Sequence, residues 1–281
     1  MLNPPLSLLS DDLLFSIVEE VAKFPFADEN LKNLSRADRA FTQSCQKFIF
    51  RTLIIGDRKI SKQLAKLKKI LDEKPSFSKR VRMVQLKKLD ISLFKDPNFI
   101  SIFQLLAKSP MSPHELHLGT LSRLTLEDPI YVIRRLTGSF FSQTLTILHV
   151  TGCVNVPLPI FLVCPRLREV LLDMDGATDK KYDEYPDDQC SGREAPLLEV
   201  FNYRNSHSVV EQMIAPPPRF NTAVVLWSNL RVLRLAPHDK EGVVCLQPIL
   251  DAACNTLEEL YLTNLNIGDC RCRVFYNTNH T

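Results

Sequence analysis

One apolar pattern recurs along most of the chain and limits its fold more than any other feature. A hexapeptide of the form φ-x-x-φ-x-φ, in which φ is apolar, occurs eight times, and successive copies start 31, 32, 32, 22, 31, 32 and 27 residues apart. The framework positions are Phe50/Leu53/Ile55, Val81/Val84/Leu86, Pro113/Leu116/Leu118, Leu145/Leu148/Val150, Leu167/Val170/Leu172, Leu198/Phe201/Tyr203, Leu230/Leu233/Leu235 and Leu257/Leu260/Leu262. Such periods are typical of arrays in which each unit buries its apolar face on its neighbours. The pattern therefore predicts an elongated repeat array over residues 53–265.

Stretches with helical periodicity lie between the copies. The first carries Leu64, Leu67 and Leu71, and similar stretches occupy residues 99–108, 129–136, 209–214 and 243–253. Apolar residues at this spacing share one face of a helix. The units that begin at Leu145 and Leu167 are only 22 residues apart, which leaves room for little more than one helical turn. We therefore expect an α/β fold in which strand and helix alternate.

A unit of strand followed by helix resembles the leucine-rich repeat. The resemblance implies an irregular solenoid, with a parallel sheet on the concave face and helices on the convex face. The family's asparagine or cysteine, three residues after the last framework leucine, is present only as Cys153. The array is therefore degenerate. Residues 266–281 show no repeat, and we expect them to form an irregular, truncated tail.

The first fifty residues have a different, helical character. Ser10 precedes Asp11 and Asp12, which favours a helix start, because the hydroxyl can accept a backbone N–H bond and the carboxylates stabilise the positive end of the helix dipole. Pro25 ends this helix, and Ser35 is expected to cap a later one. The pattern predicts three short helices over residues 5–52. So small a unit buries little apolar surface and needs a neighbour or a partner.

Three runs in this head share the features of a known family. They are LSLLSDDLLFSIV from Leu6, LKNLSRADRAF from Leu31 and CQKFIFRTLII from Cys45. Together they resemble the F-box family as it occurs in fungi. The resemblance implies that the head binds a Skp-type adaptor protein and, through it, a cullin. The implied contact residues are Leu6, Leu8, Leu9, Leu13, Leu14, Ile17, Leu31 and Leu34. The alternative is a head that caps the open end of the array, with its leucines buried inside the chain.

The strand register predicts which side chains face away from the core. Because side chains alternate along a strand, the residue between the last two framework positions points outward. We expect a row of these residues and their neighbours to bind a protein substrate, since histidine, arginine and tyrosine are suitable interface anchors. The predicted substrate-binding residues are His117, His149, Glu169, Asp173, Asn202, Arg204, Arg234 and Tyr261. The alternative for any one of them is an unoccupied strand surface.

Charge is uneven along the chain, although the formal total is only +3. Residues 58–88 carry a net charge of +10, and residues 169–194 a net charge of −6. Aromatic residues hardly interleave with the basic segment, unlike the platforms that bind single-stranded nucleic acid. We expect its lysines to solvate the first helix of the array, and we expect no nucleic-acid partner. The acidic segment, residues 174–195, is expected to form an exposed loop, and its role stays open.

No pattern in the chain indicates catalysis, a cofactor or a metal. Glycine-rich phosphate loops, GxSxG and HExxH are missing. His114 and His117 come near a metal motif, but they lie three residues apart on a predicted strand and should point to opposite faces. The 8 cysteines lack zinc-ligand spacing, and no apolar run is long enough to cross a membrane. We expect no catalytic residue, no metal, no small-molecule substrate and no membrane partner.

The sequence thus predicts a non-catalytic substrate-recognition adaptor of an SCF-type (Skp, cullin, F-box) ubiquitin ligase, in the cytoplasm, the nucleus or both. By resemblance, the head binds the Skp-type adaptor, and the repeats bind a protein substrate that the sequence does not identify. One alternative is a leucine-rich-repeat scaffold with no ligase role. A third, weaker alternative is a nucleic-acid-binding repeat protein that uses residues 58–88.

Overall fold

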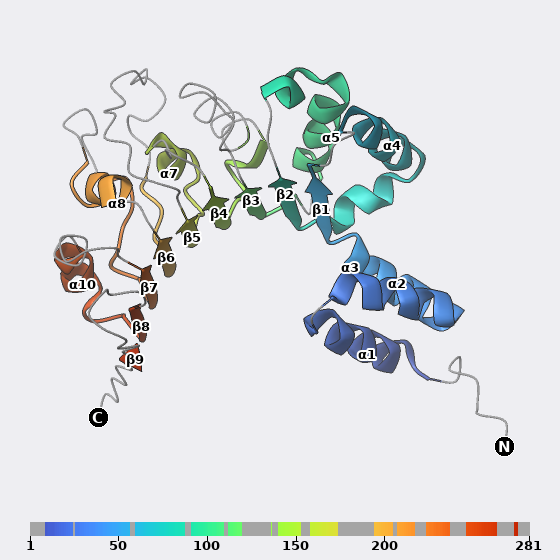
Figure 1. Cartoon of the computed structure of the whole chain (residues 1–281), viewed down its shortest axis with the longest axis horizontal. Helices are drawn as coiled ribbons and strands as arrows, with labels where there is room; N and C mark the ends of the chain where they lie inside the picture. Colours follow the sequence, from blue (N-terminus) through green and yellow to red (C-terminus); the bar gives the residue numbers. More distant parts are fainter. Residues whose placement is uncertain are drawn as a thin grey trace.

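The computed structural model contains a helical head followed by an open sheet with helices on one face (Figure 1). It describes residues 9–24, 26–56, 60–87, 91–109, 112–119, 136, 140–152, 158–173, 194–204, 207–216, 223–236, 246–262 and 273–274. In Figure 1 the strands follow an arc, the helices of the array lie on its outer side, and the head lies beside the first strand. The α/β class predicted from the sequence is confirmed.

The head contains three short helices, as the sequence predicts. They are α1 (Asp11–Lys23), α2 (Ala27–Ala37) and α3 (Arg39–Ile49). Ser10 caps α1, since the Leu13 N–H donates to its Oγ at 3.4 Å. The expected cap at Ser35 is wrong, because Ser35 lies inside α2. The chain breaks at Asp38 instead, where the backbone is extended and the carboxylate accepts the Ala40 N–H at 2.8 Å.

The head has a small apolar core of its own. Its buried members come from all three helices: Leu14, Val18, Leu31, Phe41 and Cys45. Burial raises the pKa of the Cys45 thiol, which keeps this side chain neutral in its apolar surroundings. The core of the array is a separate cluster of buried side chains. Each part therefore buries its own apolar residues.

The array forms one sheet whose strands follow one another in chain order. They are β1 (Thr52–Ile55), β2 (Met83–Lys87), β3 (Glu115–Gly119), β4 (Ile147–Thr151), β5 (Glu169–Asp173), β6 (Val200–Arg204), β7 (Val232–Ala236), β8 (Glu259–Leu262) and β9 (Arg273–Val274). Strands β1 to β8 pair in parallel, so each must return through a crossover. Strand β9 pairs antiparallel with β8, which the expectation of an irregular tail missed.

Helices connect the strands at the places that the apolar spacing predicts. They are α4 (Ile60–Glu73), α5 (Pro97–Ala107), α7 (Pro159–Val163), α8 (His207–Ile214) and α10 (Gln247–Ala253), with 3-10 turns at η2 (Pro75–Arg80) and η3 (Ile91–Lys95). Helix α7 is only 5 residues long, as its short unit requires. Helix α10 begins later than predicted because Pro248 favours a first-turn position. The stretch expected to be helical at 129–135 and the acidic residues 174–193 lie outside the described residues.

Framework side chains fill the space between the sheet and its helices. All three framework residues are buried in each of the six inner triplets, from Val81 to Leu235. In the last triplet Leu257, Leu260 and Leu262 are only partly buried. Among the described residues, only the two residues of β9 extend the sheet beyond β8. Packing therefore weakens toward this end of the array.

Gly56, directly after β1, is a position where only glycine fits. Its φ is +143°, and an added Cβ would overlap the backbone carbonyl of Lys87. We expect Gly56→Ala to lower the free energy of unfolding by about 1–3 kcal/mol or more, because backbone strain and a steric clash add. Urea denaturation measures the loss. Gly119→Ala is the matched control, since its nearest atoms, Leu86 O and Thr151 Oγ1, lie 3.6 and 3.7 Å from the added Cβ. Equal losses for both variants would contradict the account.

Candidate protein-binding surfaces

The described helices of the array lie on one face of the sheet, and none of them covers the other face (Figure 1). We call this the helix-free face. Its central row consists of Gln85, His117, His149, Leu171, Asn202, Arg234 and Tyr261, and each residue is the register partner of the next. The framework residues beside them are buried on the opposite side from β2 to β7, and Leu260 and Leu262 beside Tyr261 are partly buried. The register predicted from the sequence is therefore confirmed.

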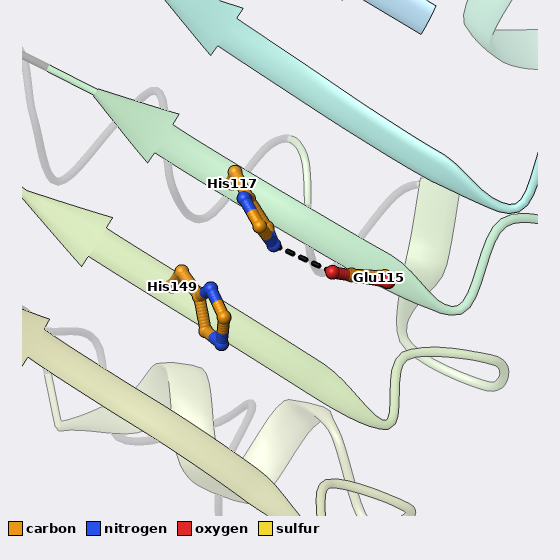
Figure 2. A group of neighbouring side chains, drawn as sticks. All are labelled: Glu115, His117 and His149. Carbon is orange, nitrogen blue, oxygen red and sulfur yellow. Dashed lines mark hydrogen bonds and ion pairs between the residues drawn. The ribbon is translucent and has the colours of Figure 1, made fainter. Parts of the chain in front are cut away.

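Two histidines and two glutamates form the middle of this face, and Figure 2 shows three of them, Glu115, His117 and His149. His117 Nε2 lies 2.7 Å from Glu115 Oε1, and His149 Nε2 lies 3.1 Å from Glu169 Oε1. The two imidazole rings lie side by side, with centroids 4.1 Å apart and planes inclined by 32°. All four side chains are half-buried. The arrangement is a polar cluster that two adjacent strands hold in place.

Electrostatics in this cluster favour an ionised glutamate. The hydrogen bond with His117 is the largest cause that lowers the pKa of Glu115, and the electrostatic influence of the nearby imidazoles lowers it further. Partial burial raises the pKa of Glu115, but by less than the hydrogen bond with His117 lowers it. The carboxylate of Glu115 is therefore an anionic acceptor at neutral pH.

The remaining predicted substrate-binding residues lie further along the same face. Arg204 Nη1 lies 3.5 Å from Asp173 Oδ2, and both residues end their strands. The Arg234 guanidinium lies 5.3 Å from the centroid of the Tyr261 ring. Asn202 is half-buried between these pairs in the register. The structure thus places all eight predicted residues on one face, in a central cluster and in pairs toward the C-terminal strands.

The head presents only part of the predicted adaptor contact set to solvent. Leu13 and Ile17 are exposed, whereas Leu14 and Leu31 are buried in the head core. Leu9 and Leu34 pack against that core, and Leu6 and Leu8 lie outside the described residues. Leu14 and Leu31 are 4% and 2% exposed, so they offer almost no surface to a partner. Leu13 and Ile17 are therefore the predicted contact residues that the described part of the head exposes most.

Two exposed aromatic residues of the head were missed by the sequence reasoning. Phe24 is 62% exposed and Phe26 is 81% exposed. Leu13 and Ile17 are four residues apart and lie along one side of α1, and Phe24 follows directly after its last residue. Phe26 has a φ of 62°, which is costly for a residue with a side chain. The clue in the sequence was Pro25 between the two, because proline cannot continue a helix. We call Leu13, Ile17, Phe24 and Phe26 the head stripe.

A basic hollow of about 430 Å³ lies between the head and the first repeats. It is lined by Phe15, Lys47, Phe48, Arg51, Lys79, Arg80, Arg82 and His114. Burial is the largest cause that lowers the pKa of His114, and Arg82 and Arg51 lower it further. His114 thus lines the hollow, whereas His117 lies on the helix-free face, so the two side chains point apart as the sequence predicts. The basic segment of residues 58–88 is divided, because Lys62, Lys66, Lys68 and Lys69 lie on α4.

Nucleic-acid binding by the full chain should be weak and should vanish near physiological salt. The division of the basic residues between α4 and the hollow limits how many phosphates they can contact together, and each phosphate contact contributes a salt slope of about −0.9 on duplex DNA. Fluorescence anisotropy over a salt series measures this. Submicromolar affinity at physiological salt, lost when Lys66, Lys68, Lys69 and Arg82 are changed to Glu, would contradict it.

The sequence reasoning also missed a set of possible metal ligands. It compared His114 with His117 along one strand, whereas the residues that come together are Glu115, His117 and His149, across two strands. Register pairing between the φ-x-x-φ-x-φ copies was the available signal, since it aligns His117 with His149. Imidazole nitrogens and a carboxylate oxygen are suitable ligands for zinc and related ions.

Comparisons with known proteins do not indicate a function for the chain. No family model, curated protein or solved structure matches the chain. Among the described residues, none of the helices is both long and apolar enough to cross a bilayer. The function is therefore inferred from the residues of this chain and their geometry.

Proposed function

We propose that the protein is a non-catalytic substrate-recognition adaptor of an SCF-type ubiquitin ligase. The head is an F-box-like domain that binds a Skp-type adaptor and, through it, a cullin. The array is a degenerate leucine-rich-repeat solenoid whose helix-free face binds a protein substrate. Ubiquitin transfer is carried out by other subunits, in the cytoplasm, the nucleus or both.

The head stripe is the observation that carries the proposal. Leu13 and Ile17 are 55% and 40% exposed, and Phe24 and Phe26 are more exposed still. Half of the eight large apolar residues exposed among the described residues therefore fall within residues 13–26. Exposed apolar residues concentrated on a small domain indicate a partner surface. A partner that covers this stripe would add the buried area that so small a domain lacks.

Separate cores favour this proposal over a head that only caps the array. The buried side chains of the head form one cluster, and those of the array form another. A cap would share its apolar core with the first repeat. The stripe also remains exposed beside the array, so the array does not cover it.

The helix-free face fits a protein ligand better than a small molecule. It is an open surface with polar and charged residues spread over adjacent strands, from Glu115 to Tyr261. Arg234 and Tyr261 are residue types that often dominate interface energies. We expect Ala at either position to weaken capture of a substrate identified by proximity labelling.

Co-expression with a Skp-type adaptor tests the proposal directly. The full chain and the adaptor should elute together in size-exclusion chromatography as a one-to-one complex. A stable chain that stays separate from the adaptor would reject the ligase role. The scaffold alternative would then remain, since it requires only the helix-free face.

A further inference from the structure

Glu115, His117 and His149 form a compact group with the composition of a metal site (Figure 2). Each side chain offers one ligand atom, and these atoms all lie within 4.8 Å of one another. His117 and Glu115 extend from the same side of β3, and His149 extends beside them from β4. Two nitrogens and one oxygen thus converge on one small region of the helix-free face.

The backbone beneath the group is rigid. Parallel pairing aligns His117 with His149 and Glu115 with Ile147, and both strands have a paired strand on their other side. The neighbouring framework residues Leu116 and Leu148 are buried at 1% and 0% exposure. A site on central strands is positioned more accurately than one on loops, so little ordering is needed when a ligand binds.

The spacing of the ligand atoms is compatible with a zinc ion. Zinc–ligand bonds of about 2.0–2.2 Å place two ligand atoms of a tetrahedral ion about 3.4 Å apart. His117 Nε2 and Glu115 Oε1 are closer than this, at 2.7 Å, and no ligand atom of the group is more than 4.8 Å from another, so rotations of the histidine and glutamate side chains can supply the difference. Calcium and magnesium are poor fits, because they prefer six or more oxygen ligands. Mixed nitrogen and oxygen ligands suit zinc and the later first-row metals.

Glu169 adds the supporting contact that metal-binding histidines commonly have. Its Oε1 lies 3.1 Å from His149 Nε2. When Nε2 carries the proton and donates to this carboxylate, Nδ1 carries the lone pair that a metal requires. Between Glu115 and His117, whose facing atoms are 2.7 Å apart, an ion would replace the shared proton. Both histidines are therefore placed to act as neutral ligands.

We propose that Glu115, His117 and His149 bind a zinc ion on the helix-free face, with Glu169 orienting His149. Three protein ligands leave a fourth tetrahedral position for water or for a side chain of a bound protein. The side chains are 14%, 22% and 21% exposed, so the ion is sheltered but reachable from solvent. This proposal concerns the site alone and stands whether or not the head binds a Skp-type adaptor.

Zinc titration of the full chain tests the proposal. After removal of metal with EDTA, isothermal titration calorimetry should show that wild type binds one more equivalent of zinc than His117→Ala/His149→Ala. Subtracting the number of zinc equivalents that the double variant binds corrects for zinc bound by other residues. Glu115→Gln keeps a hydrogen-bonding side chain but removes the anionic oxygen, and it should weaken this equivalent by at least about tenfold. Glu169→Gln should weaken it by about tenfold, as expected for a supporting residue.

His114→Ala is the matched control, because His114 is a neighbouring histidine outside the group. It should bind zinc as wild type does.

Cobalt supplies a second readout, since a tetrahedral nitrogen and oxygen site gives a visible absorption band that should disappear in Glu115→Gln. Thermal unfolding in EDTA checks that the variants fold, and zinc should raise the Tm of wild type but not of the double variant. If the double variant fails to fold, the cobalt band decides the question. Equal zinc stoichiometry and affinity in wild type and the variants, or an unchanged band in Glu115→Gln, would overturn the proposal.

Discussion

Leu233→Ala should destabilise the chain by about 2–5 kcal/mol. Leu233 is fully buried in β7 between the sheet and its helices. Truncation removes apolar contacts and leaves a cavity that neighbouring strands, held by pairing on both sides, cannot fill. The same loss is expected for Leu148 and Leu172, which are also fully buried. Chemical denaturation followed by circular dichroism measures the change.

Adjacent residues provide the control for this prediction. Arg234, next in sequence to Leu233, is exposed on the helix-free face, and Ala there should change stability by no more than about 1 kcal/mol. Leu260→Ala should cost less than Leu233→Ala, since Leu260 is only partly buried. If Arg234→Ala unfolded the chain while Leu233→Ala did not, the strand would be shifted by one residue. The substrate-binding set would then be wrong.

Leu13→Asp/Ile17→Asp should abolish binding to a Skp-type adaptor while leaving the head folded. Both side chains are exposed in the chain alone, so Asp there buries no charge within the fold. In the complex, each Asp would be an unpaired carboxylate inside an apolar interface, which costs several kcal/mol. Together the two changes should weaken binding by more than about a thousandfold. Biolayer interferometry with the immobilised adaptor measures the loss.

Ile70→Asp is the matched control for the head variant. Ile70 lies on α4 of the array and is 42% exposed, close to the 40% of Ile17. The Ile70→Asp substitution also replaces an exposed helical isoleucine with aspartate, but away from the head stripe. It should bind the adaptor as wild type does. Equal binding by the head variant and wild type would show that the stripe is not the contact surface.

The sheet was predictable because its signal is repeated. Eight copies of one apolar spacing fixed which side chains enter the core, and parallel pairing without a register shift carried the pattern from β1 to β8. The outward positions of His117 and Arg234 followed from the alternation of side chains along a strand. Consistency among many units compensates for the weak signal of any one of them.

Features set by a single local contact were harder to predict. Ser35 and Asp38 are both good caps, and only the extended backbone at Asp38 decides between them. Leu13 and Leu14 are identical in sequence character, yet packing of the three helices buries one and exposes the other. The group of Glu115, His117 and His149 depends on a pairing between strands 32 residues apart, so a search along one strand could not find it.

Hydrogen–deuterium exchange of the full chain with and without a Skp-type adaptor tests the central claim most directly. The adaptor should slow exchange in peptides that contain α1 and the following Phe24 and Phe26, and it should leave β3 to β7 unchanged. That result would place the adaptor on the head stripe and leave the helix-free face available to a substrate. No complex at all, or protection of β3 to β7 instead of α1, would contradict the account.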